Sequence, residues 1–287
     1  MRIIVWGVID LTITSRDNQF VRQVKRLLSD SGARRAEGLF AIEGARLCAD
    51  AAMSGVKIRT LLYTAESGNI YASQLEILRS KCKETYEISA PLSKAIGDTS
   101  TPQGVFCVCE LLDNRTGLDT IEYIAKPKTG YLALENLQDP ANMGAIIRTA
   151  EALGLDGLLL SDGCCDIYNP KVLRGSMGGV FRLPPIHVGS MTKAAEKLTA
   201  AGIACYACVI GNDADLVGQT SLSSCVCIIG NEGNGLRPET IAACTGRITI
   251  PMAGRAESLN AAMAAGIVMW EMTKSAGPAE TDRTALE

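Results

Sequence analysis

Three short stretches in the second half of the chain hold the side chains best suited to chemistry. They occupy residues 135–150, 228–236 and 250–260. Each combines glycine with amide, carboxylate, hydroxyl or guanidinium groups, and each lies where an apolar, strand-like run gives way to a helix-like run. Open α/β sheets bind ligands at such switch points, outside the carboxyl ends of their strands. The three stretches are therefore expected to build one site.

The first stretch contributes Asn142 and Arg148. A helix is expected to start near Gly144, which puts Arg148 just over one turn into it. Arg148 is either a surface cation or a guanidinium that grips a phosphate or a sugar, because its planar set of donors suits such oxygens. An arginine stays protonated at physiological pH, so positioning and charge stabilisation are its expected roles. Asn142 would hold the arginine and the sugar through amide hydrogen bonds.

The second stretch places Glu232 between Gly230 and Gly233, directly after a strand-like run. Glycines on both sides allow a tight loop to approach a ligand closely. They do not follow the order of the dinucleotide-binding fingerprint, so that motif is not indicated. A glutamate in such a turn is more often simply solvated, and the sequence leaves this alternative open.

The third stretch carries Ser258 and Asn260 at the start of an alanine-rich helix expected over residues 258–274. Pro251 ends strand pairing, and Gly254 frees the backbone of the loop. By position alone, Ser258 is the N-cap of the helix, because a serine hydroxyl satisfies free N–H groups of a first turn. A role in the site is the alternative interpretation.

In this order, the three stretches closely resemble the three signature motifs of the SpoU family of RNA ribose 2′-O-methyltransferases, within the SPOUT superfamily. The resemblance implies S-adenosylmethionine as methyl donor and no metal. It implies the catalytic residues Asn142, Arg148, Glu232, Ser258 and Asn260. It implies the cofactor-binding residues Gly230, Ile250, Met252 and Leu259. Whether Arg148 also acts as the base that activates the 2′-hydroxyl stays open.

Helix-like and strand-like segments alternate along the chain, which indicates an α/β fold. The expected parts are a small N-terminal α/β RNA-binding domain over residues 1–112, a linker over 113–129, a catalytic domain with a mostly parallel sheet over 130–275 and a tail over 276–287. The resemblance adds a trefoil knot and a homodimer with the site near its interface. On the last helix Met263, Ile267 and Trp270 share one face, which either meets the partner or packs on the chain's own sheet.

A basic segment points to nucleic acid in a chain whose net charge is -3. It is expected to form one amphipathic helix over residues 15–32, and a solvated helix face is the alternative explanation of its charges. The candidate RNA-binding residues are Arg16, Arg22, Lys25, Arg26, Arg46 and Arg174. The N-terminal domain favours ribosomal RNA as the partner. Transfer RNA, a non-catalytic ribosome-assembly factor and an ordinary doubly wound nucleotide enzyme are the alternatives.

The composition indicates which class of protein this chain belongs to. Hydrophobic residues make up 47% and charged residues 21%, as in ordinary globular proteins. Among eleven cysteines, Cys205 and Cys208 followed by Cys225 and Cys227 are the one spacing to test for zinc, but the second pair is too close together and the single histidine lies far off in the sequence. Reduced thiols, no metal and no membrane span are expected, since no apolar run reaches about 18 residues. The sequence therefore predicts a cytoplasmic location.

Overall fold

The computed structural model describes residues 12–112, 128–211 and 213–276. These residues form two compact units, of which the first takes in the chain up to Leu112 together with Tyr168–Arg174, and the second takes in the remainder. The predicted linker over residues 113–129 and the predicted tail lie almost entirely outside the described residues.

The first unit contains a mixed four-stranded sheet in the order β1-β4-β2-β3. Its strands are β1 (Leu39–Glu43), β2 (Ile58–Tyr63), β3 (Cys82–Glu87) and β4 (Val105–Glu110). Strand β4 pairs antiparallel with β1 and β2, whereas β2 pairs parallel with β3. Fully buried side chains on these strands, such as Phe40, Leu61 and Phe106, form the centre of its core.

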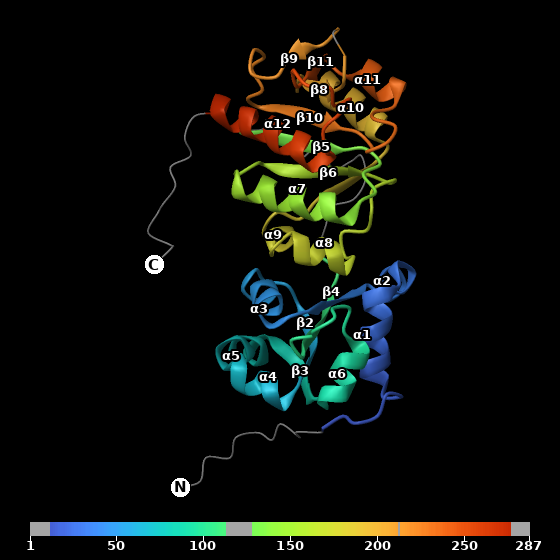
Figure 1. Cartoon of the computed structure of the whole chain (residues 1–287), viewed down its shortest axis with the longest axis vertical. Helices are drawn as coiled ribbons and strands as arrows, with labels where there is room; N and C mark the ends of the chain where they lie inside the picture. The colour runs from blue at the N-terminus through green and yellow to red at the C-terminus, as the bar shows by residue number, and fades with distance from the viewer. Residues whose placement is uncertain (1–11, 113–127, 212, 277–287) are drawn as a thin grey trace. The chain divides into compact units, whose positions relative to one another are not determined.

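Helices cover both faces of this sheet, as Figure 1 shows. They are α1 (Gln19–Ser29), α2 (Ser31–Glu37), α3 (Ala45–Met53), α4 (Ala65–Ile70), α5 (Ala72–Lys81) and α6 (Ala90–Ile96). Helices α1 and α6 pack together over one face, where Val24, Leu27 and Leu92 join the buried cluster. Helices α3 and α5 pack together over the other. The first unit is therefore a three-layer α/β structure.

The basic segment forms two helices, so the prediction of a single helix over residues 15–32 is wrong. Helix α1 ends at Ser29, and the backbone of Asp30 is extended. The Asp30 carboxylate then accepts hydrogen bonds from Gly32 N at 2.7 Å and Ala33 N at 3.2 Å. An aspartate that satisfies the free N–H groups of a first turn is a strong N-cap. The cap therefore starts α2 where the charge pattern alone continues.

The second unit is built on a seven-stranded sheet in the order β7-β6-β5-β10-β8-β11-β9. Its strands are β5 (Gly130–Leu134), β6 (Gly157–Ser161), β7 (Ile186–Gly189), β8 (Cys205–Cys208), β9 (Asp215–Leu216), β10 (Cys225–Ile229) and β11 (Gly246–Thr249). Every neighbouring pair is parallel. The central strands β5, β6 and β10 consist of buried apolar residues, as expected when both faces are covered. The predicted α/β class with a mostly parallel sheet is confirmed.

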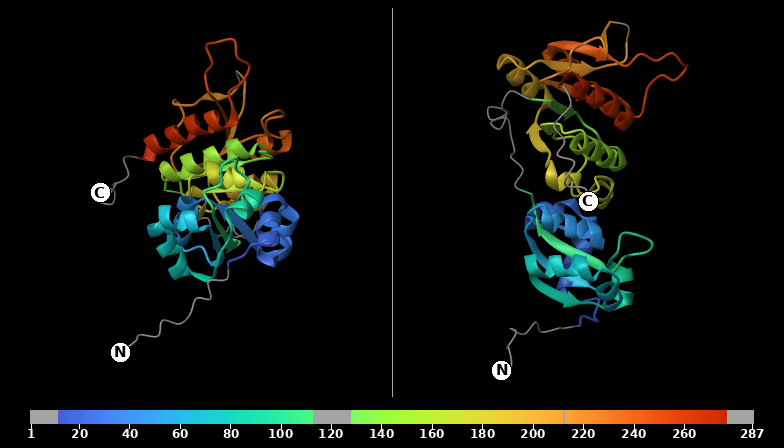
Figure 2. Two further views of the ribbon diagram at one scale, coloured as in Figure 1. Left: turned by 60° about the horizontal axis from the view of Figure 1, so that its bottom comes forward. Right: turned by 90° about the vertical axis from the view of Figure 1, so that its left-hand side faces the viewer.

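Two layers of helix enclose this sheet (Figure 2). Helices α7 (Pro140–Ala152) and α12 (Ala261–Ala276) lie side by side on one face. Helices α10 (Met191–Ala200) and α11 (Pro238–Ala243) lie on the other. The short helix α9 (Gly179–Arg182) packs against α7. The short helix α8 (Pro170–Gly175), which precedes α9 in the chain, belongs almost entirely to the first unit. This arrangement brings the ends of β5, β10 and β11 together with the starts of α7 and α12.

Helix α12 excludes one of the two interpretations of its apolar stripe. Its inner side is buried and contains Ala265, Val268, Met269 and Met272. By contrast, Met263, Ile267 and Trp270 are 64%, 38% and 55% exposed, so they do not pack on the chain's own sheet. Among the described residues, no helix has both the length and the apolar character needed to cross a bilayer.

Candidate active site

A cleft of about 700 Å³ opens in the second unit beyond the ends of β10 and β11. Its lining includes the predicted cofactor-binding residues Gly230, Ile250, Met252 and Leu259. It also includes three of the predicted catalytic residues, namely Glu232, Ser258 and Asn260. Two of the three predicted motifs therefore line one cavity. No group of histidine, cysteine, aspartate or glutamate side chains in the described part of the chain is arranged to hold a metal ion.

The segment between β5 and α7, which belongs to the first stretch and is called the first loop, leads to Asn142 at the start of α7. This helix begins at Pro140, four residues before the predicted start near Gly144. The Asp139 carboxylate caps it by accepting from Ala141 N at 2.6 Å and Asn142 N at 3.3 Å. A capping aspartate followed by proline at the first helical position defines a helix start firmly. Asn142 therefore lies in the first turn, where it is only 8% exposed.

The part of the second stretch that follows β10, called the second loop, folds back on itself. Asn231 and Gly235 exchange two backbone hydrogen bonds, each 3.0 Å long. A side chain at Gly230 would place its Cβ 2.2 Å from the carbonyl carbon of Gly235, so only glycine fits there. The Asn231 side chain closes the turn by accepting from Gly233 N at 2.9 Å. The tight turn directs Glu232 back toward the first loop.

A chain of hydrogen bonds joins the first and second loops to the third stretch, residues 250–260, which is called the third loop. The Asn260 Nδ2 group donates to Asn142 Oδ1 at 2.9 Å, and Asn142 Nδ2 donates to Glu232 Oε1 at 3.2 Å. Asn260 Oδ1 is already engaged, because it accepts from Ala262 N at 2.9 Å and Met263 N at 3.3 Å. Asn260 can therefore only donate to Asn142, which in turn can only donate to Glu232. The direction of the chain is set by the N-terminus of α12.

The same contacts correct the predicted helix cap. Helix α12 begins at Ala261, and the backbone carbonyl of Asn260 accepts its first helical bond from Ala264 N at 2.9 Å. Asn260, and not Ser258, is thus the N-cap, and the predicted helix start at residue 258 is wrong by three residues. Asparagine and serine are equally good caps, so residue type alone does not distinguish the two positions. Ser258 is exposed in the loop that lines the cleft.

Glu232 is held ionised by donors from the first loop. Its carboxylate accepts from Asp139 N at 3.1 Å and Gln138 N at 3.3 Å, besides Asn142 Nδ2. Burial raises the pKa of Glu232, but hydrogen bonds from its own backbone N–H and from these groups outweigh burial, so the pKa lies below its ordinary value of 4.5. Hydrogen bonds to a charged form favour that form. Glu232 is therefore a fixed negative charge that organises the first loop.

The lowered pKa of Glu232 predicts a pH-dependent contribution to stability. A carboxylate whose folded pKa is depressed stabilises the fold above its unfolded pKa, and this contribution is lost as the pH falls through the folded value. Glu232→Gln is therefore expected to lower the melting temperature at neutral pH, with the difference from the unmodified protein shrinking below about pH 4.5. Melting curves between about pH 3 and pH 7 measure it. Glu196→Gln, on the exposed face of α10, is the control. A difference for Glu232→Gln that stays constant over the whole range would contradict the prediction.

Arg148 stands apart from this network. It is exposed on α7 and lies six residues after Asn142, about 240° around a helix of 3.6 residues per turn. It does not line the cleft. A Cβ at Gly179 would approach the Arg148 Cα to 3.4 Å, so the arginine lies on the side where α9 packs. Within one chain, the structure brings together Asn142, Glu232 and Asn260 at the cleft but leaves Arg148 on another face of α7.

The candidate RNA-binding residues are dispersed. Arg16, Arg22, Lys25 and Arg26 are exposed on or just before α1, and Arg46 is exposed in the first turn of α3. Arg174 lies at the end of α8 and forms an ion pair of 2.9 Å with Asp98. No described contact tests whether any of them meets RNA, so their role stays a prediction.

Two residues that position the site were not singled out from the sequence. The buried carboxylate of Glu135, 1% exposed, accepts from Arg237 N at 2.9 Å and Thr240 Oγ1 at 2.7 Å. It thereby holds the start of α11 below the second loop. Asn231 Nδ2 donates to the backbone oxygen of Asn136 at 2.8 Å, which ties the second loop to the first. Glu135 comes directly after β5 and Asn231 is the second residue after β10, and that position was the available signal.

Comparisons with known proteins identify the family of this chain. The SpoU rRNA Methylase family matches residues 130–270, and the MRM3-like substrate binding domain matches residues 18–107. The Bacillus subtilis 23S rRNA (guanosine(2553)-2′-O)-methyltransferase RlmP is 31% identical over 260 residues, which cover 91% of this chain and 98% of that protein. This chain belongs to the SpoU family. The predicted resemblance is thereby confirmed.

Further proteins are similar along nearly the whole chain. The 23S rRNA (uridine(2479)-2′-O)-methyltransferase of Streptomyces viridochromogenes is 32% identical, with 91% of each chain covered. The AdoMet-bound crystal structure of the Streptomyces viridochromogenes SpoU methyltransferase AviRb has a TM-score of 0.77, 31% identity, and coverage of 90% of this chain and 97% of that one. An AdoMet-bound rRNA methyltransferase from Sinorhizobium meliloti has a TM-score of 0.79, 28% identity, and coverage of 92% and 97%. Both units of this chain are therefore shared with its relatives.

Proposed function

We propose that this chain transfers a methyl group from S-adenosylmethionine to a ribose 2′-hydroxyl of ribosomal RNA. The observation that carries the proposal is the hydrogen-bonded chain from Asn260 through Asn142 to Glu232, which joins three motif loops at one cleft. Two relatives that align with 91% of this chain are named as 23S rRNA 2′-O-methyltransferases. The match of the first unit to a substrate binding domain supports RNA as the partner.

The cleft suits S-adenosylmethionine in size and chemistry. Its volume of about 700 Å³ falls in the range of small-molecule sites. Ile250, Met252 and Leu259 offer apolar surface, and the tight turn at Gly230 brings backbone close to the cavity. Similar proteins bind AdoMet in their crystal structures. These residues would hold the cofactor.

The protein's own groups position the reaction. S-adenosylmethionine, when bound, would supply a methyl group attached to a positively charged sulfur. The sulfur is the leaving group when an oxygen nucleophile attacks the methyl carbon in line. Asn260, Asn142 and Glu232 hold the loops on either side of the cleft in one arrangement, and such fixed alignment supplies much of the rate of a two-substrate reaction. Ser258, on the third loop, is a polar group available to the ribose. Arg148, protonated at physiological pH, would grip the RNA and favour negative charge on the ribose oxygen.

A homodimer would complete this site. Met263, Ile267 and Trp270 present an exposed apolar stripe on α12, and such surfaces are typical of subunit contacts. Arg148 is on a different side of α7 from Asn142, which supports its delivery to the cleft of a second copy rather than to its own. A two-fold interface uses the same patch on both subunits and would supply both clefts equally.

The trefoil knot belongs to the same proposal. Strand β11 lies two strands away from β10 in the sheet, yet the following helix α12 returns to pack on β5, β10 and α7. The connection over residues 250–260 therefore runs from the outer part of the sheet back to its middle. A path of this kind supports a C-terminal segment threaded through a loop, which is rare outside knotted folds.

Incubation of the purified protein with methyl-labelled S-adenosylmethionine and deproteinised 23S rRNA tests the function. Label is expected in nucleotides that resist alkaline cleavage, because a methylated 2′-oxygen cannot attack the neighbouring phosphate. Transfer RNA under the same conditions serves as the comparison substrate. RNA binding without any methyl transfer would instead indicate a non-catalytic assembly factor, and label in transfer RNA alone would overturn the substrate assignment.

A further inference from the structure

Asn136, the second residue of the first loop, has a backbone conformation that side chains rarely accept. Its φ is 56°, in the left-handed region. Asparagine occurs there more often than most residues, but the conformation still costs free energy relative to an ordinary one. A residue of this kind is kept in place by its surroundings, and such residues cluster at functional sites. The contacts of Asn136 therefore indicate what holds the first loop.

The backbone around Asn136 is held from two sides. Its N–H donates to Ser161 Oγ at 2.9 Å, at the end of β6. Its carbonyl oxygen accepts from Asn231 Nδ2 of the second loop at 2.8 Å. The next residue, Leu137, is fully buried, and its carbonyl oxygen accepts from Cys165 N at 2.8 Å. The first loop is thus tied to the second loop on one side and to the chain that follows β6 on the other.

One buried hydroxyl contacts both the backbone and the side chain of Asn136. Ser161 is only 4% exposed. Its Oγ accepts from Asn136 N and donates a longer hydrogen bond, of 3.4 Å, to Asn136 Oδ1. A hydroxyl can accept and donate at the same time, and buried polar groups are costly to leave unpaired. The serine therefore favours one conformation of the asparagine.

The turn that follows β6 leaves room for this asparagine because residue 163 is glycine. Cys164 N donates to Ser161 O at 3.1 Å and closes the turn. A Cβ at Gly163 would lie 1.9 Å from Asn136 Oδ1, 2.8 Å from its Cγ and 3.3 Å from its Cβ. The backbone of Gly163 is not left-handed, so the close approach of Asn136 is what requires glycine here. Rotation of the asparagine amide would not relieve the contact with its Cβ.

Asn136 lies just before the backbone groups that hold the Glu232 carboxylate. Gln138 N and Asp139 N donate to that carboxylate at 3.3 Å and 3.1 Å. A displacement of Asn136 would therefore be passed along a short stretch of backbone to Glu232. Neither Asn136 nor Gly163 lines the cleft, so a change at either position leaves the surface offered to S-adenosylmethionine intact. Small displacements of the groups that align two substrates can cost a large part of the rate.

We propose that Asn136 is a positioning residue for methyl transfer. Held between Ser161, Gly163 and Asn231, it sets where the first loop lies relative to Glu232. This inference rests on the proposed function, because it assigns Asn136 a part in that reaction. A contribution to the stability of the fold alone is the competing explanation, and it predicts no change in the rate of variants that are fully folded.

A pair of substitutions that exchange size tests the proposal. Gly163→Ala is expected to lower kcat for methyl transfer to 23S rRNA about tenfold. Its Kd for S-adenosylmethionine is expected to stay within about twofold of normal. Asn136→Gly keeps the left-handed backbone and both of its hydrogen bonds, so its kcat is expected within about threefold of normal. Asn136→Gly/Gly163→Ala lacks the three atoms that the new Cβ would meet, and is expected to regain the rate of Asn136→Gly.

The control for size is Gly68→Ala on α4. The added Cβ there would meet an ordinary contact, 3.5 Å from the ring of Tyr63, and the backbone of Gly68 is not left-handed. This variant is expected to match the unmodified protein in rate and in melting temperature.

A second comparison tests the backbone conformation of Asn136 by itself. Alanine and glycine both lack the amide group, but alanine is strained at a φ of 56° whereas glycine is not. Asn136→Ala is therefore expected to be at least about fivefold slower than Asn136→Gly. Hydrogen exchange, measured by mass spectrometry on peptides that cover residues 135–142, is expected to quicken in Asn136→Ala and in Gly163→Ala. It should return to normal in Asn136→Gly/Gly163→Ala.

Any of three results would overturn the proposal. These are a normal kcat in Gly163→Ala, no recovery in Asn136→Gly/Gly163→Ala, and equal rates for Asn136→Ala and Asn136→Gly, each assayed well below its melting temperature. If Gly163→Ala does not fold, the order of Asn136→Ala and Asn136→Gly decides alone. No methyl transfer by the unmodified protein would disprove the proposed function. Hydrogen exchange of the first loop needs neither methyl donor nor RNA, so the two failures are distinguishable.

Discussion

Arg148→Ala is expected to slow methyl transfer to ribosomal RNA by about 10²–10³-fold, because it removes a guanidinium that favours charge on the reacting oxygen. Binding of S-adenosylmethionine is expected to stay within about twofold of normal, since interactions realised only in the transition state do not alter ground-state binding. The side chain is exposed and does not line the cleft, so the fold and the donor site are untouched. Single-turnover rates and calorimetry on the same preparations measure the two effects separately.

The controls for Arg148 separate charge from geometry. Lys193→Ala removes an exposed cation on α10, on the opposite face of the sheet, and should leave the rate unchanged. Arg148→Lys keeps the charge without the planar fork and is expected to recover only part of the rate. A normal rate in Arg148→Ala would remove the arginine from the mechanism.

Mixing two variants that each slow methyl transfer tests whether Arg148 serves a second copy. If the arginine enters the partner's cleft, a heterodimer of Arg148→Ala and Glu232→Gln subunits contains one intact composite site and one doubly altered site. Equal mixing and reassociation would then restore roughly a quarter of the normal activity, given a two-fold interface. No recovery in mixtures that demonstrably exchange subunits would place Arg148 and Glu232 of one chain in the same site.

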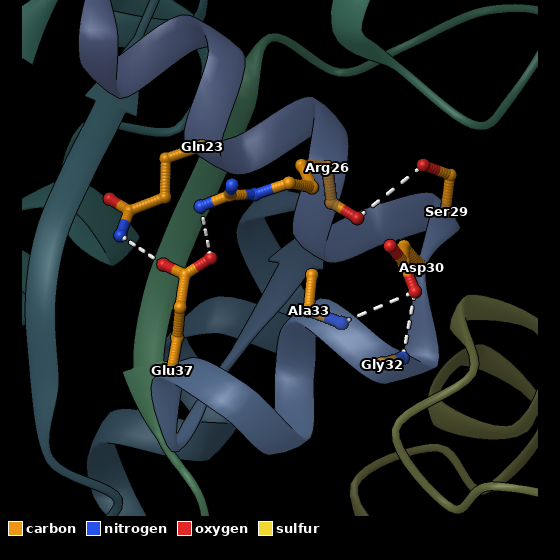
Figure 3. Close-up of polar contacts among 7 residues, drawn as sticks. All are labelled: Gln23, Arg26, Ser29, Asp30, Gly32, Ala33 and Glu37. Carbon is orange, nitrogen blue, oxygen red and sulfur yellow. Dashed lines mark hydrogen bonds and ion pairs between the residues drawn. The ribbon is translucent and has the colours of Figure 1, made fainter.

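Much of the fold follows from local patterns in the sequence. Strands β5, β6 and β10 are unbroken apolar runs, and a strand covered on both faces has no other pattern available to it. Helix starts are less visible, because they depend on which of several capping residues engages. Asp30 divides one predicted helix into α1 and α2 (Figure 3), and Asp139 starts α7 before Gly144. Both corrections come from a single carboxylate that accepts from backbone N–H groups.

The site is predictable in its members but not in its connections. Motif spacing brought Glu232 and Asn260 to one cleft, because both follow strands that end at the same edge of the sheet. Sequence spacing does not say which amide donates to which, since that depends on the cap of α12. Nor does it say which face of α7 Arg148 occupies relative to the cleft, because the position of the helix start decides that. Contacts between segments some 100 residues apart are set by tertiary packing, as Glu135 and Thr240 illustrate.

Asn260→Asp is expected to slow methyl transfer about a hundredfold while costing only about 1 kcal/mol of folding free energy. Aspartate caps a helix as well as asparagine does, so the start of α12 is retained, whereas Asn260→Ala would lose about 1 kcal/mol more. The carboxylate, however, cannot donate to Asn142 Oδ1. Asn142 must then rotate its amide, which turns its oxygen toward the Glu232 carboxylate and breaks that hydrogen bond.

Glu232→Gln should partly compensate for Asn260→Asp, because a glutamine amide can donate to the rotated Asn142 oxygen. The hydrogen-bond chain would then run in the opposite direction, from residue 232 through Asn142 to the carboxylate at residue 260. Groups in one network deviate from additivity, so the double variant is expected to be faster than the product of the two single effects predicts. Initial rates of the two single variants and the double variant, with S-adenosylmethionine affinity measured alongside, provide the comparison. Strictly multiplicative losses would mean that the direction of these hydrogen bonds has no part in catalysis, and that the two asparagines act only by occupying space between the loops.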